Sequence, residues 1–185
     1  MRETNHICEP YRNCVKIENI VCSGSFNQPL NLLELSRSGD VEYDPEMYHG
    51  GYIKTNGHSV PLYRSGKYIM PGMKDMDDVR ATFAQVKEIL EQFCDTSLFS
   101  EPEIRNMVCT SNVGRSLDLA TLFIELINEG YDASYEPESF PGLILKEEDV
   151  TFNIFSSGKF IILGCKSEAS AQESESRVLN LINSH

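Results

Sequence analysis

The chain repeats itself, and this repeat limits the possible folds more than any other feature of the sequence. Three pairs of matching segments carry it: IENIVC (17–22) and IRNMVC (104–109), YDPE (43–46) and YEPE (135–138), YRSGK (63–67) and FSSGK (155–159). Two long units are too few for a solenoid, so the repeat predicts two similar halves related by a pseudo-two-fold axis. We expect an N-terminal segment 1–14, a first repeat 15–98 and a second repeat 99–185, intertwined in one domain.

Both repeats predict the same order of elements. Each begins with a strand, at 15–22 and 104–110, where β-branched residues alternate with polar ones. A helix follows, then several short strands with tight turns, of which Asn56-Gly57 is typical of a hairpin. A second helix begins near Asp75 or Ser167. Apolar stripes at helical spacing predict core positions in the helices: Val79, Phe83, Val86, Leu90, Phe93, Leu119, Leu122, Phe123, Leu126, Ile127, Val178, Leu179, Leu181 and Ile182.

This order of elements is typical of an α+β fold with helices on one face of an antiparallel sheet. The other face of such a sheet is free, and it is usually polar. Here Val21, Val108, Phe155, Ile161 and Leu163 put aliphatic and aromatic side chains on that face. An exposed apolar sheet predicts a surface that binds a partner.

Charge alone argues against a nucleic-acid partner. The chain has 16 basic and 28 acidic residues, a net charge of −12, whereas phosphate binding needs a basic surface. The positions of the few lysines therefore matter more than the total.

Other classes of protein find little support in the sequence. There is no apolar run of membrane-spanning length and no signal peptide, so we expect no membrane partner and a cytoplasmic, nucleoid-associated location. We expect no cofactor and no enzymatic activity, because the chain has no phosphate-binding loop and no H-E-x-x-H motif. His6, Cys8 and Cys14 are the nearest approach to a metal site, but their spacing matches no zinc pattern.

Three segments of the second repeat carry a resemblance to a known family: NMV (106–108), YEPESFPGLI (135–144) and FSSGK (155–159). With them the chain resembles the TATA-box-binding proteins, in the compact form that archaea use, over residues 15–183. The resemblance implies a saddle of ten antiparallel strands with four helices on the convex face. Its concave face would bind and bend A·T-rich promoter DNA through the minor groove, as in other members of that family.

The resemblance also implies the residues that contact DNA. Asn19 and Asn106 would bond to base acceptors, and aromatic wedges would unstack base steps while lysines contact phosphates. The complete set is Asn19, Val21, Tyr48, Lys54, Tyr63, Lys67, Ile69, Lys74, Asn106, Val108, Phe140, Pro141, Lys146, Phe155, Lys159, Ile161, Leu163 and Lys166.

A loop of the second repeat resembles the family's contact with transcription factor B, through which RNA polymerase is recruited. Its residues are Tyr135, Glu136, Pro137 and Glu138, and the two carboxylates would pair with a basic partner surface. The alternative is a simple turn, in which proline fixes the backbone.

The first repeat departs from the family pattern. Tyr48 and Tyr63 stand where the family has phenylalanine wedges, and His49 stands where the second repeat has Pro141. Both repeats lack the threonine with which the family touches the central bases: Pro71 stands there in the first repeat and Leu163 in the second. Pro71 also removes a ladder donor, which a sheet tolerates only at an edge or a bulge.

Three functions remain open at this stage. The first is a general or alternative initiation factor that binds promoter DNA. The second is a paralogue with weakened DNA binding that regulates transcription through protein contacts. The third, an enzyme, has no supporting motif. The free protein is either a monomer or a homodimer that hides its apolar face.

Overall fold

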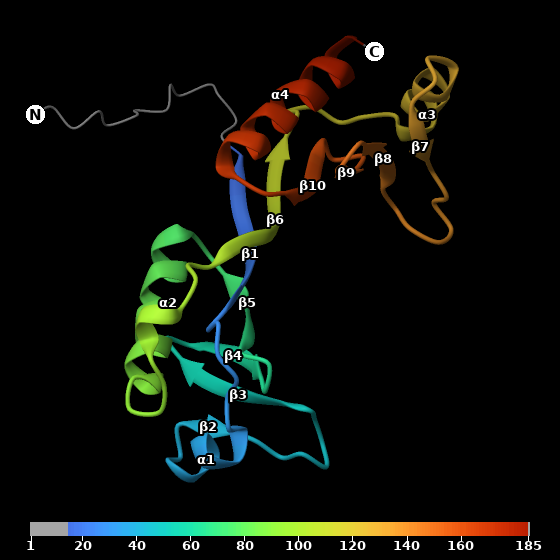
Figure 1. The fold of residues 1–185 in the computed structure, drawn as a ribbon. Coiled ribbons are helices and arrows are strands. Elements are labelled where there is room, and N and C mark those ends of the chain that lie inside the picture. The colour runs from blue at the N-terminus through green and yellow to red at the C-terminus, as the bar shows by residue number, and fades with distance from the viewer. Residues whose placement is uncertain (1–14, 185) are drawn as a thin grey trace, which may run out of the picture. The chain divides into compact units, whose positions relative to one another are not determined.

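The computed structural model describes residues 15–184, which form a ten-stranded sheet, the helices α1 to α4 and a short 3-10 helix (Figure 1). The chain divides into two compact units. Of the described residues, we call Ile17–Met107 the N-terminal unit, and 108–184 with 15–16 the C-terminal unit. The strand β6 (Glu103–Asn112) passes from the first unit into the second.

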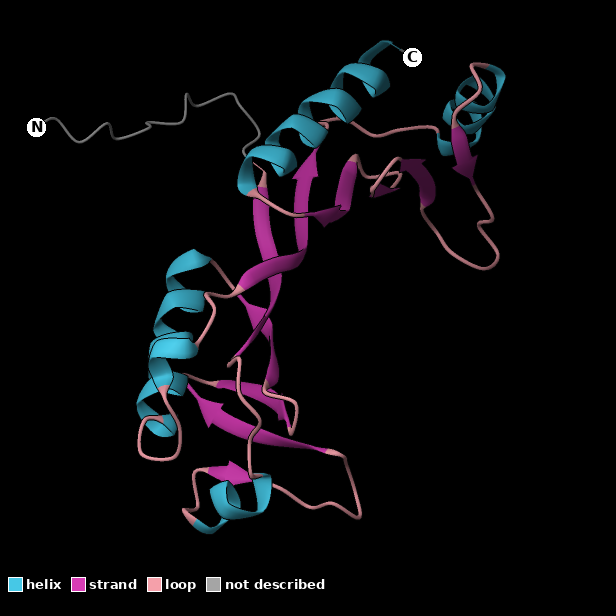
Figure 2. Ribbon diagram, in the orientation of Figure 1, coloured by secondary structure: helices cyan, strands magenta, loops and turns pink. Residues whose placement is uncertain are grey.

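The N-terminal unit contains two α-helices, a 3-10 helix and five strands. Its elements are β1 (Lys16–Ser25), α1 (Leu32–Arg37), β2 (Val41–Glu42), β3 (Gly50–Thr55), β4 (His58–Tyr63), β5 (Lys67–Met73), α2 (Met76–Leu90) and the 3-10 helix η1 (Thr96–Leu98). The strands pair in the order β2-β3-β4-β5-β1, each antiparallel to its neighbour. The helix α2 packs on β3 and β5 and lies along one side of these strands (Figure 2).

The C-terminal unit repeats this plan. After β6 come α3 (Leu119–Asn128), β7 (Asp132–Ser134), β8 (Leu143–Glu147), β9 (Val150–Ile154), β10 (Lys159–Cys165) and α4 (Glu168–Ser184). The strands follow the order β6-β10-β9-β8-β7, and α4 packs on β10 while α3 packs on β7. The closing helices begin where the sequence predicts, and the first strand of each repeat extends beyond its predicted end.

Alternation along each strand separates the core from the other sheet face. In β1, Ile20 and Cys22 are fully buried, while Asn19 and Val21, which alternate with them, stay half-buried. In β10, Phe160 and Ile162 are fully buried and alternate with Ile161. Because successive side chains point to opposite faces, the buried set marks the face that the helices cover.

One predicted core position is exposed, and four others, Phe93, Phe123, Leu179 and Leu181, are only half-buried. In α3, Leu119, Leu122 and Leu126 are buried, but Ile127 is 43% exposed and its neighbour Ile124 is 54% exposed. The helix packs on the three-residue strand β7, which covers only part of its apolar surface. Helical spacing therefore identified the stripe but overestimated its width.

The hairpin predicted at Asn56-Gly57 is confirmed. These two residues connect β3 to β4, with φ of 50° and 77°, the left-handed backbone that a two-residue turn requires. The strand β4 then carries His58 to α2, where its Nε2 lies 2.9 Å from Asp78 Oδ2. The backbone N–H of Lys74 donates to the same carboxylate oxygen at 2.9 Å, so Asp78 connects the start of α2 to the hairpin.

Replacing Asp78 with asparagine should destabilise the protein by about 1 kcal/mol at neutral pH. Burial alone would raise the pKa of Asp78, but the hydrogen bonds from Lys74 and His58 outweigh it and lower the pKa below 3.8. The stabilisation by the ionised Asp78 carboxylate is therefore fully present above pH 3.8. It is lost as the pH falls through the lowered pKa of Asp78 in the folded state. Denaturant titrations from pH 7 to pH 2 should show the two proteins converging at low pH.

The neighbouring Asp77 provides the matched control for this comparison. Its side chain is 88% exposed and pairs with Arg80 on the surface of the same helix. Asp77→Asn should change the stability by less than about 0.5 kcal/mol at any pH. An Asp78→Asn curve that runs parallel to wild type down to pH 2 would contradict the assigned role.

Two prolines interrupt the sheet of the N-terminal unit. Pro71 and Gly72 of β5 lie opposite the single residue Val21 of β1, which forms a β-bulge. Since β5 lies between β4 and β1, the bulge is what accommodates Pro71, as the sequence predicts. Pro61 lies in β4, and the register between β4 and β5 contains one pair, Leu62 opposite Tyr68. The matching strands β9 and β10 pair at four positions.

Backbone amides of β4 and β5 should therefore exchange with solvent faster than those of β9 and β10. Fewer ladder bonds make local opening of the N-terminal sheet less costly. Hydrogen–deuterium exchange on the whole protein measures both strand pairs in one sample, so β9 and β10 serve as the internal control. Equal protection of the two pairs would show that the prolines do not weaken the ladder.

The described residues contain four cysteines, none of them in a disulfide. Cys22, Cys109 and Cys165 are buried, and Cys94 is partly exposed. Within residues 15–184, no three His, Cys, Asp or Glu side chains gather as a metal site would require, and His6, Cys8 and Cys14 lie outside the described residues. No helix of this same range has the length and apolar character needed to cross a bilayer.

Candidate nucleic-acid interface

Each unit presents a sheet face made of the strand residues that alternate with its core. We call it the open face. In the N-terminal unit the open face comprises Asn19, Val21, Tyr52, Lys54, Tyr63, Lys67 and Ile69. The second open face, with the whole of β6 counted in it, comprises Asn106, Val108, Ile144, Lys146, Phe155, Lys159, Ile161 and Leu163. Each open face thus combines an amide, aliphatic side chains, an aromatic ring and lysines.

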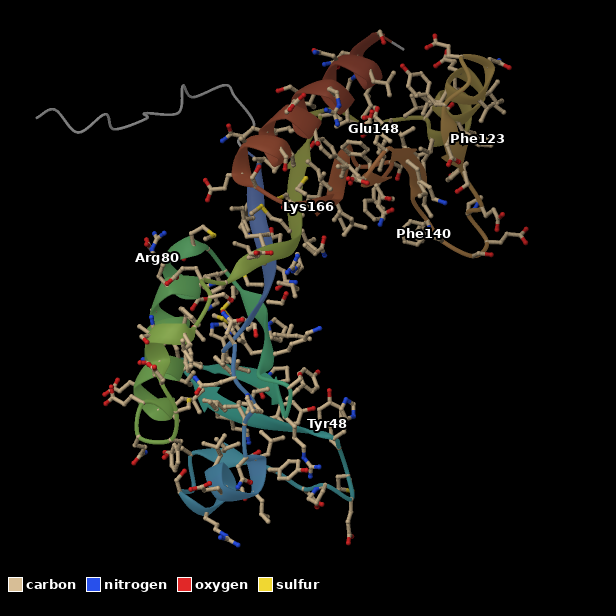
Figure 3. All side chains as sticks on the ribbon, in the orientation of Figure 1. Tyr48, Arg80, Phe123, Phe140, Glu148 and Lys166 are labelled. Atoms are coloured by element: carbon tan, nitrogen blue, oxygen red, sulfur yellow. The ribbon has the colours of Figure 1, made fainter. Side chains whose placement is uncertain are left out.

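An aromatic pair lies beside the open face of each unit. In the N-terminal unit, Tyr48 before β3 faces Tyr63 at the end of β4, with ring centroids 6.3 Å apart. In the C-terminal unit, Phe140 before β8 faces Phe155 after β9, with centroids 5.8 Å apart in an edge-on arrangement. Figure 3 shows Tyr48 and Phe140 on the corresponding loops of the two units. The structure therefore brings together both wedge pairs that the sequence predicts.

A glycine lies against each aromatic pair. A β-carbon on Gly50 would come 2.8 Å from Tyr48 Cε1 and 3.0 Å from Tyr63 Cε1. A β-carbon on Gly142 would come 2.7 Å from Phe140 Cε1 and 3.1 Å from Phe155 Cε1. The missing side chain lets both rings lie over the backbone in the same way in both units.

A tight turn fixes the second ring of each pair. Gly66 N–H donates to the carbonyl of Tyr63 at 2.8 Å, and Gly158 N–H donates to that of Phe155 at 2.9 Å. Each glycine carbonyl then accepts a bond at 2.8 Å from the chain after the first strand, from Phe26 N–H or Val113 N–H. The YRSGK and FSSGK segments are thus equivalent in backbone structure as well as in sequence.

The aromatic pair of the N-terminal unit is polar. Tyr48 Oη lies 2.8 Å from Tyr63 Oη, and either hydroxyl can donate. This hydrogen bond and burial raise the pKa of Tyr63 to about 12. Burial and the nearby Tyr48 also raise the pKa of Tyr52, whose ring stacks on Tyr48 at 5.3 Å. At neutral pH Tyr63 therefore keeps its hydroxyl proton.

A pocket of about 680 Å³ adjoins this pair within the N-terminal unit. Its lining includes Tyr63, Ile69 and the cations Arg64, Lys67 and Arg105. Arg105 Nε donates to Ser23 Oγ at 2.7 Å, and its guanidinium pairs with Glu103 at 2.9 Å. The pocket combines an aromatic wall with basic groups, a surface suited to an anionic, partly apolar ligand.

The predicted phosphate-binding lysines fall into two groups. Lys54, Lys67, Lys146 and Lys159 lie on open-face strand positions, and Lys54 pairs with Glu42 at 2.7 Å. The structure places Lys74 and Lys166 elsewhere, in the connections between the last strand and the closing helix of each unit. Lys166 is labelled in Figure 3. Its Nζ lies 3.5 Å from Asp149 Oδ2.

The predicted partner loop lies between β7 and β8. Glu136, Pro137 and Glu138 are exposed, while the half-buried Tyr135 ring lies 6.5 Å from Phe123 of α3. The carbonyl of Glu136 accepts a bond from Phe140 N–H at 2.9 Å, so the loop also positions the wedge ring. Asp44 and Tyr48 form the same 2.9 Å bond in the N-terminal unit. The loop is thus both a turn and an exposed acidic surface.

Four residues of this region were not predicted from the sequence. Tyr52, Arg64 and Arg105 line the open face or its pocket, and His49 stacks on Tyr63 at 5.5 Å. Strand alternation could have identified Tyr52, which lies two residues before Lys54. The positions of Arg64 and Arg105 depend on distant segments meeting, so no local pattern predicts them.

Comparisons with known proteins agree on one family. The family model "Transcription factor TFIID (or TATA-binding protein, TBP)" matches residues 14–93 and 101–185, once in each repeat. A TATA-box-binding protein of Archaeoglobus fulgidus is 33% identical over 171 residues, covering 89% of this chain and 92% of the relative. TATA-box-binding protein C of Halobacterium salinarum is 34% identical, covering 91% and 99%.

A solved structure shows the same fold. The Methanococcus jannaschii TBP superposes with a TM-score of 0.76 at 31% sequence identity, covering 92% of this chain and 99% of that one. The matches confirm the resemblance stated from the sequence motifs, the two-fold repeat and the α+β fold.

Proposed function

We propose that this chain, which belongs to the TATA-binding protein family, binds and bends A·T-rich promoter DNA through the minor groove. As a general or alternative initiation factor, it would then recruit transcription factor B and, through it, RNA polymerase. The relatives are named for binding the TATA box, and that activity is transferred here as part of the proposal.

The matched aromatic pairs are the observation that carries this proposal. Tyr48 with Tyr63 and Phe140 with Phe155 occupy equivalent places, each against a glycine. Inserting rings between base steps unstacks them and bends the duplex, a mechanism known from this family itself. Two wedges at equivalent places suit a duplex, whose two strands give it a similar symmetry.

The open faces supply the remaining contacts. Val21, Val108 and Ile161 offer an apolar surface to the minor-groove floor, where A·T and T·A pairs look nearly alike. Amides of Asn19 and Asn106 can donate to A N3 and T O2. Lysines on the same strands neutralise phosphates and position the protein without reading sequence.

Net charge and local charge have opposite signs here. The chain carries −12 overall, whereas Arg64, Lys67 and Arg105 gather around one pocket of the N-terminal open face. Because phosphate binding releases counterions, we expect affinity to fall steeply as salt rises. Lys54 and Lys166 would exchange their carboxylate partners for phosphates on binding.

The acidic loop between β7 and β8 is the proposed contact for transcription factor B. Glu136 and Glu138 are exposed and lie on a loop whose backbone is fixed by the bond from Phe140. Carboxylates presented on a defined loop favour a basic partner surface.

A second function is favoured by the N-terminal unit. The bulge at Pro71 and the short β4–β5 register alter the sheet that would contact DNA. A paralogue with weakened DNA binding could instead regulate transcription by binding transcription factor B.

Energy transfer distinguishes the two functions. An A·T-rich duplex carries a fluorophore at each end and is titrated with the protein, with and without transcription factor B, across a salt series. A salt-sensitive rise in energy transfer is expected for a bending factor. Binding of transcription factor B without any change in the DNA would refute the first function and support the regulator.

A further inference from the structure

The two wedge pairs differ in one chemical respect, the hydroxyl groups. Tyr48 Oη and Tyr63 Oη lie 2.8 Å apart, at the end of the rings away from the backbone, whereas Phe140 and Phe155 have no polar atom there. His49 stacks on Tyr63 and Tyr52 stacks on Tyr48, so ring contacts fix both tyrosines. The polar tip is therefore a defined feature of the N-terminal unit.

The hydrogen-bonding capacity of this tip can be counted. Each phenol has one donor and two acceptor lone pairs. The bond between the hydroxyls uses one donor and one acceptor, which leaves one donor and several lone pairs for a ligand. A nearby base edge could therefore find either an acceptor or a donor at the tip.

One hydrogen-bonding group in the minor groove distinguishes G·C from A·T pairs. A·T pairs show only acceptors, while G·C adds the guanine N2 amino donor. Against a phenylalanine pair this amino group would be buried without a partner, which costs free energy. Against the tyrosine pair it can donate to a phenol oxygen.

We propose that the Tyr48–Tyr63 hydroxyl pair lets the N-terminal unit accept a G·C pair at the base step beside its wedge, whereas the C-terminal unit requires A·T there. This inference rests on the proposed function, because it assigns sequence preference to the same interface. The preferred DNA element is then asymmetric, and its asymmetry orients the protein on the promoter.

The surroundings of the tip agree with a polar base edge. Tyr63 lines the pocket that also contains His49, Arg64 and Lys67. Arg64 and Lys67 can only donate hydrogen bonds, but the hydroxyl of Ser65, which lines the same pocket, can accept one from the guanine amino group.

Duplexes with one altered pair test the proposal. A single G·C pair is moved step by step through an A·T duplex, and each affinity is divided by that for the all-A·T duplex. A parallel set replaces guanine with inosine, which lacks the N2 amino group but keeps the pairing with cytosine. The proteins compared are wild type, the double variant Tyr48→Phe/Tyr63→Phe and the reciprocal variant Phe140→Tyr/Phe155→Tyr.

For wild type we expect a G·C pair to lower affinity about tenfold at the step beside the Phe140–Phe155 wedge. At the step beside the Tyr48–Tyr63 wedge it should lower affinity less than about threefold. The Tyr48→Phe/Tyr63→Phe variant should no longer tolerate G·C beside its own wedge. Replacing guanine with inosine at that step should restore its binding. The Phe140→Tyr/Phe155→Tyr variant should gain tolerance of G·C beside the C-terminal wedge. Each variant's own affinity for the all-A·T duplex reports whether its interface is folded.

Two results would overturn the inference in distinguishable ways. Equal G·C penalties at both wedge steps in wild type, unchanged by the tyrosine substitutions, would refute the hydroxyl pair while leaving DNA binding intact. Failure of wild type to bind any duplex would refute the proposed function and the inference with it.

Discussion

Replacing Phe140 with alanine should abolish the DNA bend and weaken binding by about 100-fold or more. Phe140 packs edge-on against Phe155, and its loss removes both a wedge and the support of its partner. Smoothly bending a short site costs roughly 1–6 kcal/mol, which only the contacts of the bent state repay. Without the wedge at one end, the remaining contacts do not offset the cost of bending. A loss of about 2.7 kcal/mol in binding free energy corresponds to a 100-fold loss of affinity.

Energy transfer across an end-labelled duplex measures the bend, and a direct titration measures affinity. Ile124→Ala is the matched control, since Ile124 is 54% exposed on α3 of the same unit and lies outside the open face. The control should bend DNA like wild type. If Phe140→Ala, with an unchanged melting temperature, also bent DNA like wild type, the C-terminal wedge would be misassigned.

Local chemistry made much of the fold predictable. The Asn56-Gly57 hairpin follows from two residues that tolerate positive φ between alternating strands. Pro71 predicts the bulge found opposite Val21, because an interior strand accommodates a missing N–H only there. The repeat adds a second copy of each signal, so a weak pattern in one half is supported by the other.

Features made by distant segments were not predictable. The Tyr48–Tyr63 hydrogen bond joins residues whose approach depends on the register of β3 with β4 and on the space left by Gly50. The wide apolar stripe of α3 placed Ile127 in the core, whereas the strand that α3 packs on is too short to cover it. The sequence gives the pattern of a face, and tertiary contacts decide how much of it is buried.

Some features of the interface were predictable from the sequence and others were not. Identical residues at matched places indicated Asn19, Asn106 and the lysines on both open faces, since repetition separates a shared role from chance. Lys74 and Lys166 matched equally well, yet both lie in the connections to the closing helices. Sequence matching finds equivalent positions, but it does not report whether they lie on a strand or in a connection.

The second large effect is expected from Gly158→Ala, which should destabilise the protein by about 3 kcal/mol. Gly158 has a φ of 83°, where a side chain costs roughly 1–2 kcal/mol. A β-carbon would also come 2.1 Å from the carbonyl oxygen of Arg115, and overpacking of this kind adds about 1–3 kcal/mol. Chemical denaturation of both proteins measures the difference.

Gly130→Ala separates backbone strain from the clash. Gly130 has a φ of 88° and no atom within 4 Å of the added carbon, so its substitution should cost only about 1–2 kcal/mol. Gly66→Ala should instead match Gly158→Ala, because its β-carbon would come 2.1 Å from the carbonyl oxygen of Gln28. Equal losses at Gly130 and Gly158 would mean that the chain beside the turn moves freely. A larger loss at Gly66 and Gly158 means that both turns are fixed by the backbone they contact, and that Tyr63 and Phe155 are presented by rigid supports.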